Sequence, residues 1–168
     1  MENQPDDEER TRPPLMEDLV GLCRELNARD AKYIVVGGMA INIHGFVRNT
    51  EDIDLLIETG NFNERKVLEV LSLLPEGAAK ELHPGEVAEY VVVRVCDEIT
   101  VDLMAKACGH DYPSAAGMIS AVIVNGVSIP FASPTLLWKT KQTFREKDLI
   151  DRSFLRKLLE DRGEWPVE

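Results

Sequence analysis

The sequence predicts an α/β protein, because runs with the character of β-strands alternate along the chain with segments of helical period. The apolar run 33–36 ends at the glycine pair Gly37-Gly38, where a backbone without Cβ atoms can turn tightly and lead into a helix. After that helix the pattern changes to an alternation over residues 51–58. Further along, residues 119–124 and 127–130 flank Asn125-Gly126, the dipeptide favoured by the tight type I′ turn of a hairpin.

Length and charge limit the classes of protein to which this chain can belong. Its 168 residues, 44% of them apolar, are expected to form one domain over residues 15–168 that ends in two helices. The 19 basic and 30 acidic residues give a net charge of -11, which argues against a surface built to coat nucleic acid or an anionic membrane. Residues 1–14 are rich in acids and prolines with almost no apolar side chain, so a flexible acidic tail is expected.

The cysteines and the lack of membrane signals indicate a cytoplasmic protein. Cys23, Cys96 and Cys108 are odd in number and lack the C-x-x-C spacing of metal sites, so reduced and partly buried thiols are expected. The first residues contain no apolar signal core, and no apolar run approaches the roughly 20 residues that span a bilayer. No membrane partner is predicted.

The first half of the chain contains three predicted helices. Leucines at positions 15, 19, 22 and 26 give the first helix a broad apolar stripe, and it ends near residues 27–30. The short helix after the glycine pair ends at Gly45, a residue type that favours the left-handed conformation at helix ends. Asn61 or Asn63 is expected to cap the third helix, which Pro75 and Gly77 end.

The middle of the chain is richer in strands. Residues 78–88 contain a loop signal and stay unassigned, whereas 90–95 and 99–104 are rich in β-branched residues and indicate a hairpin. Asp102 lies inside the second of these strands. Residues 112–117 are expected to cross to the next hairpin as an irregular helix.

Two helices are predicted at the end of the chain. Ser133 is a typical N-cap, followed by Pro134 at the first helical position, and Phe144 is expected on the inner face of this helix. The last helix is expected from about residue 148 to residue 161, with Leu149 among its apolar positions.

Two carboxylates lie close together in the alternating stretch 51–58. Asp52 and Asp54 share one face of the predicted strand, and they repel each other unless a cation lies between them. Mg²⁺ is a natural occupant, since it takes oxygen ligands from one or two carboxylates and from substrate phosphates. The helix start at Gly37-Gly38 presents unpaired N–H groups that suit those phosphates. The alternative is that Asp52 lies in a turn and Asp54 on a solvated strand face.

The same stretch resembles the nucleotidyltransferase superfamily of the DNA polymerase β type, and within it the small bacterial proteins related to the AbiEii toxins. The resemblance lies in the pattern GG-x-A followed by HG-x-x-R-x-T-x-D-x-D. The matching residues are Gly37, Gly38, Ala40, His44, Gly45, Arg48, Thr50, Asp52, Asp54 and Leu55. This resemblance implies the nucleotidyltransferase fold, a mixed β-sheet flanked by helices, and transfer of a nucleoside monophosphate from an NTP to an acceptor.

The resemblance also implies a catalytic metal site. Asp52, Asp54 and Asp102 are expected to hold Mg²⁺, with two ions about 3.5–4 Å apart and Mn²⁺ as an alternative. Asp102 would orient or deprotonate the acceptor hydroxyl. Gly37 and Gly38 are expected to bind the nucleotide through backbone donors alone, since many members of the superfamily carry serine as the second residue of this motif.

Three further motif residues can contribute to the site or to the fold. Arg48 neutralises Asp52 or Glu51 across the turn, or it holds triphosphate oxygens. Thr50 orders the loop by hydrogen-bonding the backbone near Asp52, which would support nucleotide and metal binding indirectly. His44 precedes the helix-ending glycine and has no second histidine at metal spacing, so capping and packing are favoured over catalysis.

A basic segment stands out near the end of this acidic chain. Between Lys139 and Lys157 there are seven basic and three acidic residues, or +4. A solvated helix face is one explanation. The other is a surface that faces phosphates or the acceptor, with Lys141 and Arg145 binding the nucleotide. The latter is supported by the R-x-K-D-x-x-D pattern from Arg145 to Asp151, which resembles an element of AbiEii-like proteins.

These observations predict a Mg²⁺-dependent nucleotidyltransferase with an NTP substrate and an unidentified acceptor, which is RNA, protein or a small molecule. A toxin-type member of a toxin–antitoxin pair fits the resemblance, with an antitoxin or a second copy of the chain as partner. The alternative from another class is a non-catalytic, antitoxin-like regulatory protein that keeps the fold. Retention of all three expected acids favours catalysis.

Overall fold

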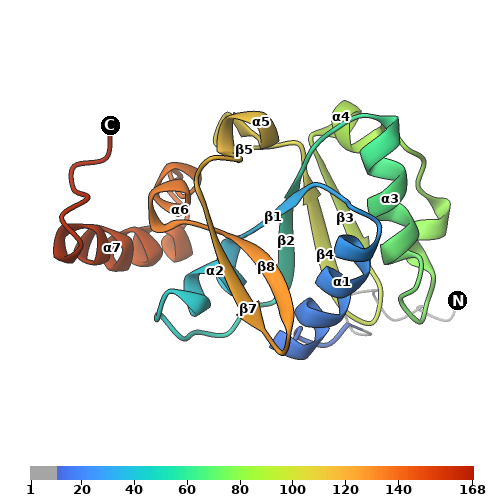
Figure 1. Cartoon of the computed structure of the whole chain (residues 1–168), viewed down its shortest axis with the longest axis horizontal. Helices are drawn as coiled ribbons and strands as arrows, with labels where there is room; N and C mark the ends of the chain where they lie inside the picture. Colours follow the sequence, from blue (N-terminus) through green and yellow to red (C-terminus); the bar gives the residue numbers. More distant parts are fainter. Residues whose placement is uncertain (1–10) are drawn as a thin grey trace, which may run out of the picture.

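Six β-strands form one mixed sheet in the order β3-β4-β2-β1-β8-β7 (Figure 1). A computed structural model of the chain describes residues 11–168. The strands are β1 (Tyr33–Val36), β2 (Asp52–Ile57), β3 (Val92–Cys96), β4 (Thr100–Met104), β7 (Ile119–Val124) and β8 (Val127–Ala132), with a separate small ladder of β5 (Lys106–Ala107) and β6 (His110–Asp111). In the centre, β1 and β2 are antiparallel, whereas β2 is parallel to β4 and β1 is parallel to β8. The predicted α/β architecture with a mixed sheet is confirmed.

Helices flank this sheet, with α1 and α3 to one side and α6 and α7 to the other (Figure 1). The helices are α1 (Met16–Ala28), α2 (Gly37–Ile43), α3 (Asn61–Leu71), α4 (Glu86–Tyr90), α5 (Tyr112–Ala115), α6 (Pro134–Thr140) and α7 (Glu146–Asp161), with the 3-10 helix η2 at Ala78–Glu81. The segment 78–88, unassigned from sequence, contains η2 and the start of α4. All four residues of β1 are buried, so the core runs through the centre of the sheet.

The predicted hairpin turn and the serine cap of α6 are confirmed, whereas the predicted asparagine cap of α3 is not, because the asparagine side chain bonds another part of the backbone. Asn125 and Gly126 have φ values of +49° and +78°, as the predicted hairpin turn requires. Ser133 caps α6 by accepting a hydrogen bond from the Leu136 N–H at 3.2 Å. The predicted asparagine cap of α3 was wrong, because Gly60 occupies the N-cap position and the side chain of Asn63 instead bonds the backbone of Lys32 and Glu58.

The C-terminal helices begin and end differently from the prediction. Helix α6 ends at Thr140, so Phe144 lies beyond it and is 97% exposed instead of facing inward. Helix α7 begins at Glu146, two residues before the predicted start, and Leu149 is 45% exposed. Leu155 and Leu159 contribute to the buried face of α7.

Residues 1–10 of the expected tail lie outside the described part of the chain. Within residues 11–14, Arg12 donates to the Asp18 carboxylate at 2.7 Å and its backbone N–H bonds the Glu98 carbonyl at 3.0 Å. Cys23 is buried and Cys96 half-buried as expected, whereas Cys108 is exposed, and within residues 11–168 all three are free thiols. Over the same range, none of the helices has the length and apolar character needed to cross a bilayer.

Candidate active site

The glycine pair after β1 makes room for two side chains of the acidic segment. Gly37 has a φ of +68°, and a Cβ atom there would lie 2.1 Å from Oδ2 of Asp54. A Cβ atom on Gly38 would lie 2.3 Å from Cγ2 of Thr50. Both distances are shorter than a Cβ contact can be, so this packing requires glycine at both positions. The turn that begins α2 and the strand that carries the acids are therefore fitted to each other.

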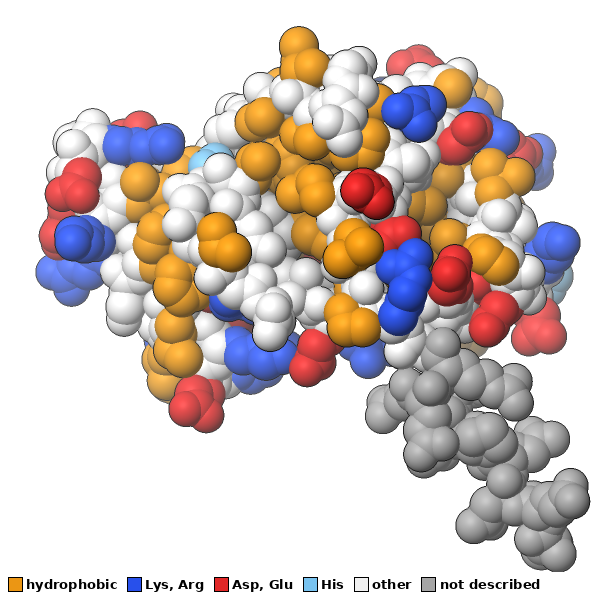
Figure 2. Space-filling model, turned by 90° about the horizontal axis from the view of Figure 1, so that it is seen from below, with side chains coloured by type: hydrophobic (Ala, Val, Ile, Leu, Met, Phe, Trp, Pro, Cys, Tyr) orange, Lys and Arg blue, Asp and Glu red, His pale blue; other side chains and the backbone are white. Residues whose placement is uncertain are grey.

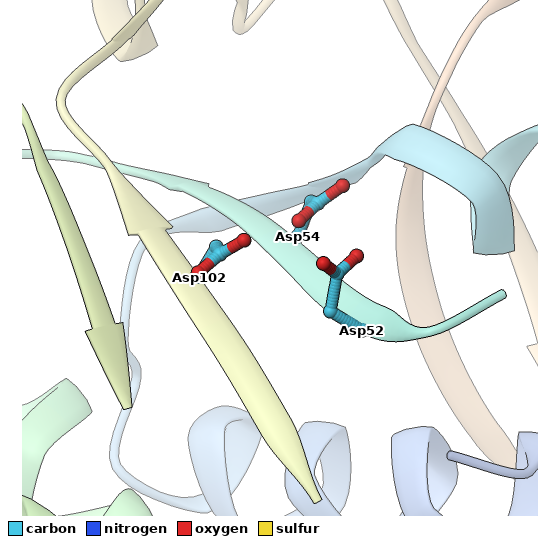
Figure 3. Close-up of side chains that lie close together, drawn as sticks. All are labelled: Asp52, Asp54 and Asp102. Carbon is cyan, nitrogen blue, oxygen red and sulfur yellow. The ribbon is translucent and has the colours of Figure 1, made fainter. Parts of the chain in front are cut away.

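Three carboxylates converge beside this turn (Figure 3). Asp52 and Asp54 come from β2, and the parallel register of β2 and β4 places Asp102 beside Asp54. One oxygen from each of the three side chains can be chosen so that all lie within 4.8 Å of one another. The pairing of β2 with β4 thus brings together the three acids named from the sequence.

Burial and mutual repulsion make this triad unfavourable when all three acids are ionised. Burial raises the pKa of Asp54 to about 8, and the negative charges of Asp52 and Asp102 add to the effect. The pKa of Asp52 is also raised, first by burial and then by the charge of Asp102, although Arg94 opposes the shift. Asp54 therefore tends to keep a proton at neutral pH unless a cation takes its place.

Arg94 also lies at the candidate site, although the sequence motifs do not indicate it. It lies on β3 directly opposite Asp102. Its Nε and Nη2 atoms donate to the two carboxylate oxygens of Asp102 at 2.9 and 3.0 Å, and Nη2 also reaches Oδ2 of Asp52 at 3.2 Å. The sequence feature that could have identified it is a lone arginine in the valine-rich strand β3, which pairs with β4, where Asp102 is the only acid.

A group of cations lines the site beside the acids, and buried aspartates of α7 hold it in place. Arg48 forms a two-point ion pair with Asp151 at 3.0 and 2.7 Å. Lys141 contacts Asp151 at 3.0 Å and Asp148 at 3.3 Å, and Arg145 contacts Asp148 at 3.0 Å. The side chains of Asp148 and Asp151 are 1% and 0% exposed. Of the two interpretations of Arg48, neutralisation of Asp52 or Glu51 was wrong, because its ion-pair partner is Asp151, whereas binding of triphosphate oxygens stays a prediction.

Asp148 differs from the triad in its electrostatics. Burial alone would raise its pKa, but hydrogen bonds from Thr143 and Arg145 and the charge of Lys141 outweigh burial and lower it. Asp148 is therefore ionised at neutral pH and keeps its cations in position. The basic segment predicted from Lys139 to Lys157 is thus partly a structural network and not only a solvated helix face.

The acids and cations line one cavity of about 130 Å³. Asp52, Asp54 and Asp102 line it together, and the other charged lining residues are Arg48, Glu51, Arg94, Lys141, Arg145, Lys147 and Asp148. Gly38 and Thr50 also line it. A second cavity of about 270 Å³ adjoins the first, since Glu51, Asp52 and Arg94 line both. Figure 2 shows basic, acidic and hydrophobic side chains interspersed on one face of the molecule.

Thr50 and His44 have structural contacts. The hydroxyl of Thr50 lies 4.0 Å from the Met39 sulfur instead of bonding the backbone near Asp52, so that part of the prediction was wrong within the described part of the chain. His44, at the end of α2, places its Nε2 atom 2.8 Å from the Ala132 carbonyl. Burial lowers the pKa of His44, which agrees with a packed and neutral side chain.

Comparison with known proteins identifies the fold. No protein-family model matches the chain, and no curated protein matches its sequence. Among solved structures, an antigenic nucleotidyltransferase-like protein from Paracoccidioides brasiliensis is 19% identical over 88% of this chain and 79% of its own, with a TM-score of 0.51. The lincosamide antibiotic adenylyltransferase LnuA, bound to lincomycin, is 12% identical over 88% of this chain and 99% of its own, with a TM-score of 0.55.

A third solved structure leads to the same fold. ANT(2")-Ia in complex with adenylyl-2"-tobramycin is 12% identical over 87% of this chain and 90% of its own, with a TM-score of 0.54. At these identities the similarity establishes the fold alone. The chain therefore has the fold of nucleotidyltransferase-like proteins, with the acidic triad and the cation group at one cavity.

Proposed function

We propose that this protein is a metal-dependent nucleotidyltransferase that transfers a nucleoside monophosphate from an NTP to an acceptor. The observation that carries the proposal is the convergence of Asp52, Asp54 and Asp102 with a group of fixed cations in one cavity. The acids suit a divalent cation, and the cations suit the oxygens of a triphosphate. Such a division of charge serves phosphoryl-type transfer, which depends mainly on positioning and electrostatic stabilisation.

The residues present fit a divalent metal ion. All three ligand groups are carboxylates, the donors preferred by Mg²⁺ and Mn²⁺, and they lie close enough to share an ion. Burial and neighbouring negative charges raise the pKa of Asp54, and a bound cation would offset both effects, so the raised pKa agrees with a role as a metal ligand. When bound, the ion supplies charge neutralisation at the phosphates and lowers the pKa of a coordinated hydroxyl.

The protein side chains would position the two substrates. Arg48, Lys141 and Arg145, fixed by Asp148 and Asp151, would hold triphosphate oxygens together with the backbone of the Gly37-Gly38 turn. In the transfer, an acceptor oxygen forms a bond to the α-phosphorus while the bond to the leaving pyrophosphate breaks. The acceptor proton would pass to a carboxylate oxygen of Asp102, with Asp52 and Asp54 committed to the metal–nucleotide complex.

The acceptor is proposed to be a small molecule, because two similar structures carry lincomycin or an adenylylated tobramycin. RNA or protein is the acceptor expected if the chain is a toxin of the AbiEii-like branch, as the motif HG-x-x-R-x-T-x-D-x-D suggests. Incubation with Mg²⁺ and each labelled NTP in the presence of small-molecule, RNA or protein pools separates these cases. Label in none of the pools would favour the regulatory, non-catalytic alternative.

A further inference from the structure

Arg94 already occupies one edge of the acidic triad. Its guanidinium bonds both oxygens of Asp102 and one oxygen of Asp52. These carboxylates are two of the three groups that a metal ion would use. A positive guanidinium and a divalent cation cannot both lie against the same oxygens without strong repulsion.

We propose that Arg94 is a movable counter-cation, which competes with divalent metal at the Asp52–Asp102 edge and has to leave before this edge can bind an ion. The inference rests on the proposed function, because it takes the triad to be a metal site. Within residues 11–168 the hydrogen bonds from Arg94 to the triad go to both oxygens of Asp102 and to one oxygen of Asp52, so a first ion would bind between Asp52 and Asp54 while Arg94 remains in place. Binding at the second edge is then coupled to movement of one side chain.

The surroundings of Arg94 allow that movement. Strand β3 is at the edge of the sheet, and the Arg94 side chain is 52% exposed. It lines both adjoining cavities, so it can turn from the first into the second without disturbing the core. Glu51 lines both cavities as well and is 81% exposed, and although it pairs with Lys147 at 3.6 Å, its carboxylate can also accept from Arg94 there.

Movement of Arg94 would also free the third carboxylate. With both oxygens bonded to the guanidinium, Asp102 is poorly placed to accept a proton from an acceptor hydroxyl. Once Arg94 turns away, those oxygens become available as ligands or as proton acceptors. Arg94 is therefore a positioning residue, because its movement links metal binding to the availability of the Asp102 oxygens as ligands or proton acceptors.

Titration of the free protein with Mn²⁺, without nucleotide, tests the proposal. In Arg94→Ala the metal ion no longer has to displace the guanidinium from Asp52 and Asp102. Arg94→Ala is therefore expected to bind Mn²⁺ about 10- to 100-fold more tightly than wild type, which corresponds to the free energy of a hydrogen bond to a charged group. Arg94→Lys keeps the charge but lacks the planar fork, so an intermediate affinity is expected. Arg156→Ala is the matched control, since it removes the same charge from an exposed pair with Glu160 on α7.

Thermal melts of the same variants with and without Mn²⁺ separate this role from a structural one. A larger metal-induced increase in Tm for Arg94→Ala than for wild type supports competition. Equal or weaker metal binding in Arg94→Ala and Arg94→Lys overturns this inference while leaving the proposed function intact. Absence of metal binding in wild type and in every variant contradicts both proposals.

Discussion

The raised pKa of Asp54 predicts that the metal-free protein loses stability as the pH rises. The ordinary pKa of 3.8 is raised to about 8 in the folded protein, so the folded state binds a proton more tightly than the unfolded state. This contribution to stability is fully present below about pH 4 and is lost as the pH rises toward 8. The perturbation that isolates it is Asp54→Asn, which resembles the protonated carboxyl group and does not titrate.

The size of the effect follows from proton linkage. One proton contributes at most about 1.4 kcal/mol per pH unit, and Asp54 is partly open to the cavity, where water screens its charge. We therefore expect the free energy of unfolding of wild type to fall by about 2–4 kcal/mol relative to Asp54→Asn between pH 5 and pH 8. Comparison with the variant is needed because the lowered pKa of His44 has the opposite pH dependence.

Urea unfolding in EDTA at pH 5, 6, 7 and 8 measures this difference. Wild type and Asp54→Asn should have similar stability at pH 5, and the variant should be the more stable protein at pH 8. Addition of Mg²⁺ at pH 8 should stabilise wild type by about 2.7 kcal/mol at a hundredfold excess over Kd, and the variant much less. A difference between the two proteins that does not change with pH would refute the reasoning.

Three further predictions follow from the packing around the site. Gly37→Ala should displace the Asp54 carboxylate and abolish the Mg²⁺-induced increase in Tm, because its Cβ atom would lie 2.1 Å from Oδ2. Gly38→Ser should lower the free energy of unfolding by about 1–3 kcal/mol, because its Cβ atom would overlap Cγ2 of Thr50. Adding Thr50→Ser, which removes Cγ2, should recover part of this loss, as a double-mutant cycle in urea can measure. Asp151→Ala should cost about 3–5 kcal/mol, since it removes the ion-pair partner of Arg48 and leaves the buried Lys141 with Asp148 alone, and it should weaken nucleotide binding in a fluorescence titration.

Gly45 provides the control for Gly37. It also has a positive φ, +113°, but among the described residues nothing lies within 4 Å of the position of its Cβ atom. Gly45→Ala should therefore lower Tm through backbone strain and still respond to Mg²⁺. If both alanine variants lose the response, the effect comes from strain near α2 and not from contact with Asp54.

The features predictable from the sequence are those that short stretches specify. The glycine turn, the shared face of Asp52 and Asp54 and the Asn125-Gly126 hairpin each depend on a few adjacent residues. Asp102 was identified through the family resemblance, because no local pattern reveals that β4 lies parallel to β2.

The features of the site that the sequence does not reveal depend on contacts between residues far apart along the chain. Arg48 and Asp151 are 103 residues apart, and neither has a local signal that names the other. Arg94 became a site residue only through the register of β3 and β4. Phe144 was misplaced because α6 ends early, where the backbone turns to bring Arg145 to Asp148.

The most direct test of the central claim compares NTP binding and transfer of labelled nucleotide for wild type and for Asp52→Asn, Asp54→Asn and Asp102→Asn, each with Mg²⁺ and the acceptor pools. Asp52→Asn and Asp54→Asn should lose binding of the metal–nucleotide complex. Asp102→Asn should keep much of the NTP affinity but lose transfer by about 10² to 10⁴-fold. Full transfer activity in Asp102→Asn, or no transfer by wild type to any acceptor, would contradict this claim.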